Sequence, residues 1–173
     1  MSTNKTVSIV FYKGPGTLAE KAIRLWTKSR YAHCEFRRSD GLYHSNDRFR
    51  FVSRAEPIRM DSEEWEECPI ELPGEIIERV ERRQLRKNGT RYDWRGIVFS
   101  QILPLGIHNK QRWFCSKSNA DDLAYAYRLM KRSRKADFEM YVTLLSAFET
   151  IPPQNFSPER LYREVKGLSQ TKG

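Results

Sequence analysis

The chain has 173 residues, enough for one domain with its own core, and its 39% hydrophobic and 31% charged residues are typical of a globular protein in water. The net charge is +9, and an acidic stretch at residues 61–90 lies between two basic parts. A basic surface favours anionic partners such as nucleic acid, anionic glycans or lipid headgroups, without selecting one of them. The apolar runs are too short for a secretory signal or a transmembrane segment, so we expect a cytoplasmic protein unless another route delivers it.

The first 58 residues are predicted to form strands and one helix. Apolar and β-branched runs predict strands at residues 7–12, 31–38 and 42–45, with a further strand within 49–58. The segment Ser39-Asp-Gly41 is typical of a hairpin turn. Thr17 and Glu20 form a capping-box pattern that starts a helix ending near Lys28. The apolar face expected for this helix consists of Leu18, Ala22, Leu25 and Trp26.

The remainder of the chain is predicted to be mainly helical. An acidic surface turn is expected at 61–67, a strand at 68–72, a loop at 104–112, and helices at 73–87, 92–103, 116–134, 138–148 and from Ser157 onward. The helix at 116–134 is expected to bury Leu123, Ala124, Tyr127 and Leu129. We expect residues 1–167 to form a single domain and residues 168–173 a flexible tail.

The cysteines are the first residues that suggest chemistry. Cys34, Cys68 and Cys115 are an odd number, and no CxxC pair or zinc-binding spacing occurs. We therefore expect three free thiols in a reducing compartment, with no metal and no cofactor. Cys34 and Cys68 lie in predicted strands and are expected to be small core residues. Cys115 differs, because a loop enters a long predicted helix there.

Cys115 is the candidate nucleophile. The N–H groups and dipole of a helix N-terminus favour both a thiolate and a developing oxyanion. His33 is the candidate general base, because an imidazole within reach of a thiol can remove its proton. The alternative for each is structural: Cys115 is a buried cysteine beneath Trp113 and Phe114, and His33 is a core or edge residue of its strand.

Two residues are candidates for the group that orients His33. Glu35 lies two positions after His33 and therefore on the same face of the strand, where its carboxylate can hold the imidazole. His44 follows the hairpin turn and can lie beside His33 on the paired strand. The sequence leaves both possibilities open. His108 lies among polar residues of a predicted loop and is expected to be exposed.

Residues near these motifs are candidates for substrate binding. They are Tyr31, Tyr92, Trp94, Trp113 and Ser116, although aromatic side chains suit core packing equally well. The basic run at 131–135 ends a predicted helix, where it complements the helix dipole. No helix-turn-helix, RRM or zinc-finger pattern accompanies that run, so nucleic-acid binding is the less favoured interpretation.

Five motifs occur in a characteristic order. They are YAHCEF at 31–36, DGLYHS at 40–45, YDW at 92–94, WFCS at 113–116 and FSPERL at 156–161. This order resembles the permuted NlpC/P60 family of papain-like cysteine hydrolases. It is most similar to the small versions of bacteria and tailed phages and to the YiiX-like and lecithin:retinol acyltransferase-like branches. The resemblance covers roughly residues 7–120 and 155–163.

The resemblance implies an α+β fold in which a small antiparallel sheet packs against the cysteine-bearing helix. It makes Cys115 the nucleophile, His33 the base, and Glu35 or His44 the third member of the triad. Members of the family cleave or transfer acyl groups at amide or ester bonds, commonly in cell-wall peptides or lipids, without a metal. The implied partner is an acyl-bearing peptide or lipid, and the phage relatives add the virion to the expected locations.

The chain departs from the family pattern in two places. Relatives commonly have an acid after the Cys-Ser pair, where this chain has Lys117, and the segment 129–153 has no counterpart and is expected to be a helical insertion. Two other functions stay open. A non-catalytic structural protein of a virion, such as a phage tail or ejection protein, would use the basic surface and the insertion for contacts. A nucleic-acid-binding protein would lose affinity steeply with salt.

Overall fold

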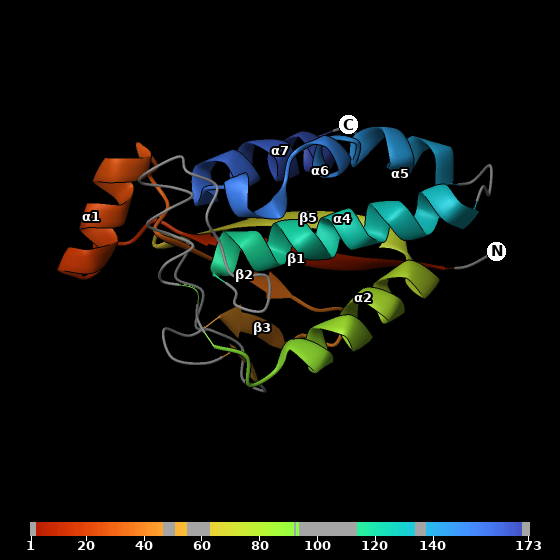
Figure 1. Cartoon of the computed structure of the whole chain (residues 1–173), viewed down its shortest axis with the longest axis horizontal. Helices are drawn as coiled ribbons and strands as arrows, with labels where there is room; N and C mark the ends of the chain where they lie inside the picture. Colours follow the sequence, from red (N-terminus) through yellow and green to blue (C-terminus); the bar gives the residue numbers. More distant parts are fainter. Residues whose placement is uncertain are drawn as a thin grey trace.

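The structure, a computed structural model, describes residues 3–46, 51–54, 63–91, 93, 114–133 and 138–170. These residues form an α+β fold with an antiparallel five-stranded sheet in the order β4-β3-β2-β1-β5 (Figure 1). The strands are β1 Asn4–Tyr12, β2 His33–Arg37, β3 Tyr43–Asn46, β4 Phe51–Arg54 and β5 Trp65–Pro73. The expected helix at 92–103 and loop at 104–112 lie outside the described residues, apart from Asp93.

The hairpin predicted between β2 and β3 is confirmed. The backbone N–H of Arg38 donates to the carbonyl of Leu42 at 2.8 Å, and Gly41 has φ +82°, a conformation that glycine adopts without strain. Strand β5 begins earlier than predicted, at Trp65, so the expectation of an acidic turn is wrong for residues 65–67. The long strand β1 pairs with all three of these residues and thereby extends β5 beyond its apolar part.

Helix α4 runs across the middle of the molecule, with α2 on one side of it and α5, α6 and α7 on the other (Figure 1). The helices are α1 Leu18–Thr27, α2 Gly74–Lys87, α4 Cys115–Ser133, α5 Glu139–Leu144, α6 Ala147–Thr150 and α7 Pro158–Gln170, with a 3₁₀ helix η3 at Pro153–Asn155. Among the helices of the described ranges, none is both long and apolar enough to span a bilayer.

The core lies between the sheet and these helices. The four residues that α4 was predicted to bury are all buried. Residues of α5 and α6, including Tyr141 and Phe148, belong to the same core, so the described part of the segment 129–153 packs with the sheet and α4. The helix predicted at 138–148 is two helices in the structure. Helix α7 continues to Gln170 and so includes residues 168–170 of the predicted tail.

Helix α1 begins as predicted but is packed differently. The Thr17 backbone N–H donates to Glu20 Oε2 at 2.6 Å, and the Glu20 N–H donates to Thr17 Oγ1, which completes the capping box. Leu18 and Leu25 of the predicted apolar face are, however, 84% and 83% exposed. Periodicity identifies an apolar side of a helix, but it does not say whether another element covers it.

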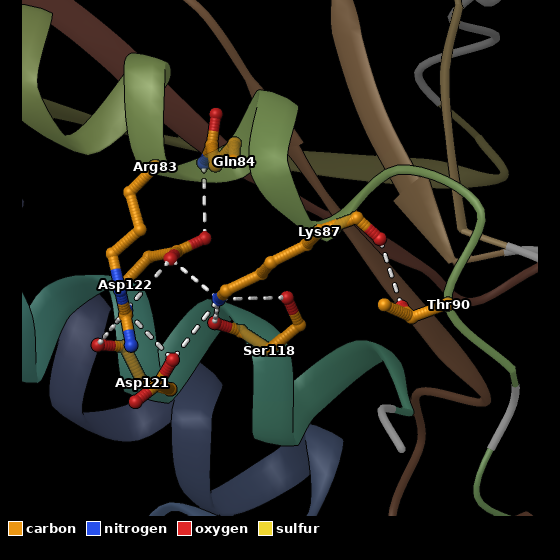
Figure 2. Close-up of polar contacts among 7 residues, drawn as sticks. All are labelled: Arg83, Gln84, Lys87, Thr90, Ser118, Asp121 and Asp122. Carbon is orange, nitrogen blue, oxygen red and sulfur yellow. Dashed lines mark hydrogen bonds and ion pairs between the residues drawn. The ribbon is translucent and has the colours of Figure 1, made fainter. Parts of the chain in front are cut away.

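A buried cluster of charges fastens α2 to α4 (Figure 2). Lys87 Nζ lies 2.6 Å from Asp122 Oδ1 and 3.0 Å from Asp121 Oδ2, and Arg83 lies 2.7 Å from Asp121. Gln84 donates to the second oxygen of Asp122 at 3.1 Å. Burial raises the pKa of Asp122 against the lowering effect of Lys87. Charges in such a position are tolerated only while they are paired.

We expect Lys87→Met to lower the free energy of unfolding by about 3–5 kcal/mol, because it leaves a buried carboxylate without its closest partner. Denaturant unfolding measures the loss. The control is Arg86→Met on the exposed side of the same helix, which should change stability by less than about 0.5 kcal/mol. Adding Asp122→Asn to Lys87→Met should recover part of the loss. Equal stability of the Lys87 and Arg86 variants would contradict the role given to the cluster.

Candidate active site

Cys115 is the first residue of α4 and is 6% exposed. Its position is set by its neighbours: the Ser116 hydroxyl donates to the Phe156 carbonyl at 2.6 Å, and the Ser118 N–H donates to the Phe114 carbonyl at 2.9 Å. The first contact ties the start of α4 to the segment before α7, and the second closes the first helical turn. The thiol therefore lies at the positive end of a 19-residue helix, where a thiolate is favoured.

His33 and Glu35 come from the start of β2. They occupy alternate positions of the strand, and His33 Nε2 lies 3.2 Å from Glu35 Oε1. The Glu35 side chain is buried, whereas 24% of the His33 side chain is exposed. Glu35 therefore contacts one ring nitrogen of His33. The other ring nitrogen can form a hydrogen bond with a second partner.

Cys115 lies near His33 and Cys34, the first two residues of β2. Although consecutive strand residues point to opposite faces, both the His33 ring and the Cys34 thiol are near enough to Cys115 to lower its pKa, because Cys115 lies where the strand begins. Burial tends to lower the pKa of His33, but the charge and hydrogen bond of Cys115, together with those of Glu35, raise this pKa to about 10.

The pKa of Cys115 moves the opposite way. The hydrogen bond from the Cys34 thiol, the positive charge and hydrogen bond of His33 and the Cys34 backbone together hold it well below its usual value, although burial opposes them. Both shifts favour a thiolate on Cys115 beside an imidazolium on His33. This is the charge state of an activated cysteine nucleophile.

The register of the sheet separates the two candidates for the orienting residue. His44 pairs with Phe36 across β2 and β3, so it shares a face with Phe36 and lies on the face opposite Glu35. It is buried, and burial together with the charges of Lys87 and Arg38 lowers its pKa to about 2. A neutral His44 thus lies beside the α2–α4 charge cluster, and Glu35 is the residue in contact with His33.

The other predicted site residues divide into two groups. Tyr31 is fully buried, and its hydroxyl donates to Glu66 at 2.7 Å. The centroid of its ring lies 4.6 Å from that of Tyr162. Ser116 is buried and donates to the Phe156 carbonyl. The prediction that Tyr31 and Ser116 bind substrate therefore does not fit their surroundings, in which both have packing and anchoring roles. The remaining candidates, Tyr92, Trp94 and Trp113, lie outside the described residues, as does His108.

Three contacts were not anticipated from the sequence. Cys34 is buried as predicted, but its thiol also contacts Cys115 and accepts from Asn119 Nδ2 at 3.4 Å. The available signals were the position of Cys34 next to His33 and the four-residue spacing between Cys115 and Asn119. Lys117, which departs from the family pattern, is buried 3.4 Å from Asp93 of the YDW motif. Burial lowers the pKa of Lys117 against the opposing charge of Asp93.

A scan against protein-family models and searches of curated proteins and of solved structures found no significant match to the chain. Among the described residues, no group of three or more His, Cys, Asp or Glu side chains is arranged to hold a metal ion.

We expect Glu35→Gln to lower the pKa of His33, because a neutral amide removes the carboxylate charge that favours the imidazolium. The pH titration of the His33 ring signals by NMR measures this, with His33→Ala for assignment. His44→Gln should leave the His33 titration unchanged, since His44 lies on the other face of the sheet. A shift caused by His44→Gln but not by Glu35→Gln would reverse the assignment of the orienting residue.

Proposed function

We propose that the protein is a thiol-dependent hydrolase or acyltransferase that acts on an amide or ester bond, with Cys115 as nucleophile, His33 as acid and base, and Glu35 as the orienting group. The observation that carries this proposal is the buried contact of Cys115, at the N-terminus of α4, with the His33 ring that Glu35 holds. A nucleophile, a base and an orienter in hydrogen-bonded sequence are the parts that covalent acyl transfer needs.

The chemistry proceeds in two halves. The Cys115 thiolate attacks the carbonyl carbon, and backbone N–H groups at the start of α4 stabilise the negative oxygen of the tetrahedral intermediate. The intermediate collapses to a thioester, and the leaving amine or alcohol takes the proton of the His33 imidazolium. His33, now neutral, removes a proton from water or from an acceptor alcohol or amine. That nucleophile displaces the thiolate, which restores the starting pair.

We further propose that this α+β fold is the permuted papain-like fold of the NlpC/P60 family. Its support is the order of elements, since the histidine strand β2 precedes the cysteine helix α4, and the antiparallel arrangement of the sheet. Within that assignment the substrate is a cell-wall peptide or a lipid, and the protein acts in the cytoplasm or as part of a virion. The net charge of +9 suits a substrate on an anionic surface.

The test is the pH dependence of Cys115 modification by iodoacetamide, followed by peptide mass spectrometry, with Cys34 and Cys68 as internal references. We expect Cys115 to react with an apparent pKa well below about 8.5, the ordinary thiol value. His33→Ala should move that pKa upward, because the imidazolium charge is lost. Turnover of a panel of activated esters and amides should disappear in Cys115→Ala and fall by about 10²–10⁴-fold in His33→Ala.

Cys115→Ser is the strictest variant, because it conserves shape and removes only the thiolate. Full turnover in Cys115→Ser would exclude the thiol mechanism, and an ordinary pKa for Cys115 that ignores His33 would exclude the activated pair. Circular dichroism shows whether each variant is folded. Cys68→Ala is the matched control, since it removes a buried cysteine from the same core without touching the site.

A structural role on the same fold is the second candidate. The observation that favours it is the exposed apolar side of α1, where Leu18 and Leu25 are available for contact with another protein. An inert Cys115 together with stable assembly that Leu18→Ser and Leu25→Ser disrupt would support this role and oppose the enzyme.

A further inference from the structure

The thiol of Cys34 lies between Asn119 and Cys115. Asn119 Nδ2 is 3.4 Å from Cys34 Sγ, and the Cys34 thiol is near enough to Cys115 to lower the pKa of Cys115. Asn119 is four residues after Cys115 on α4, so the two side chains lie on the same side of the helix, one turn apart. All three residues are buried. Two residues of one helix thus contact the same thiol of the facing strand.

The direction of these hydrogen bonds follows from the chemistry of each group. The Asn119 amide donates to Cys34 and thereby uses the sulfur as an acceptor. A thiol has a single proton, and the Cys115 sulfur, whose ionised form the Cys34 thiol favours, can accept it. A hydrogen bond to an ionised group in a buried site is stronger than one between neutral groups.

We infer that Cys34 is a second side-chain hydrogen-bond donor to the Cys115 nucleophile, in addition to His33, and that Asn119 is the positioning residue that directs the Cys34 thiol toward Cys115. The inference rests on the proposed function, because it concerns the nucleophile of that reaction. It assigns a role to a residue that would otherwise be a core cysteine.

The consequence is specific to the second half of the reaction. When the thioester breaks, His33 is occupied by the proton that it takes from the attacking water or acceptor. The Cys34 thiol can meanwhile donate to the departing Cys115 sulfur, which makes it a better leaving group. Loss of the donor should therefore slow release of the acyl group and raise the amount of acyl-enzyme.

The sheet offers a matched control for this role. Cys68 on β5 pairs with Ile9, and Cys34 on β2 pairs with Phe11, so both cysteines point from the same face of the sheet into the core. Burial raises the pKa of Cys68 to about 11. Removing either thiol costs similar packing, but only Cys34 contacts Cys115.

The experiment titrates Cys115 in Cys34→Ala, Cys34→Ser, Asn119→Ala and Cys68→Ala between about pH 4 and about pH 10, the range in which thiolates form. Thiolate ultraviolet absorbance and iodoacetamide reactivity are read in oxygen-free buffer, each against Cys115→Ala. The pH at the inflection of each profile is compared between variants. The plateau reactivity is not used, because it also depends on the intrinsic nucleophilicity of the thiolate.

We expect Cys34→Ala to move the inflection upward, with roughly tenfold less thiolate on the acid side of the profile, as loss of one donor to a charged group implies. Cys34→Ser should restore most of the wild-type profile, because its hydroxyl also donates. Asn119→Ala should shift the inflection in the same direction as Cys34→Ala, and Cys68→Ala should not shift it. With an acetyl ester as acyl donor, intact-mass spectrometry should show more acetylated Cys115 in Cys34→Ala.

A wild-type inflection in Cys34→Ala would overturn the inference. If His33→Ala still shifts the inflection, the proposed function stands and Cys34 is only a packing residue. If wild-type Cys115 itself titrates as an ordinary thiol, the proposed function fails first. Should Cys34→Ala not fold, Asn119→Ala decides alone, and an unchanged inflection in that variant overturns the inference.

Discussion

The packing of the first turn of α4 against the first residues of β2 is the constraint on which the rest of the candidate site depends. It places Cys115 against His33 and Cys34, which are about eighty residues away in the sequence. Two anchors hold it: the Ser116 hydroxyl bond to Phe156 and the salt bridges between Lys87 and the aspartates of α4. Because interiors are close-packed, the helix cannot slide along the strand without breaking both.

Two of the buried ionic systems on α4 differ in their exposure to solvent. The charges of one, around Asp122 and Lys87, are paired within the α2–α4 interface and contribute to the position of the helix. The charges of the other, around Cys115 and His33, include a ring that is partly exposed. The first system is closed off within the protein, whereas solvent reaches the His33 ring of the second.

Much of the fold could be predicted from the sequence, because its signals are local. The capping box at Thr17, the hairpin at Gly41 and the long helix after Cys115 each depend on residues within a few positions of one another. Predictions failed where the structure of a segment depends on contacts with residues far away in the sequence. Strand β5 starts at Trp65 because β1 supplies partners there. The apolar pattern of α1 also leaves open whether Leu18 is covered, and no element of the described chain covers it.

The sequence by itself determined which residues are able to react and the faces on which the His33 and Glu35 side chains lie, since residue chemistry and strand alternation require no tertiary information. Only the tertiary structure decided between Glu35 and His44, because strand register pairs His44 with Phe36. It alone brought Asn119 and Cys34 to Cys115. The physical reason is that pKa values and hydrogen bonds depend on distances of a few ångström between segments far apart in the chain, and those distances are fixed only when the core packs.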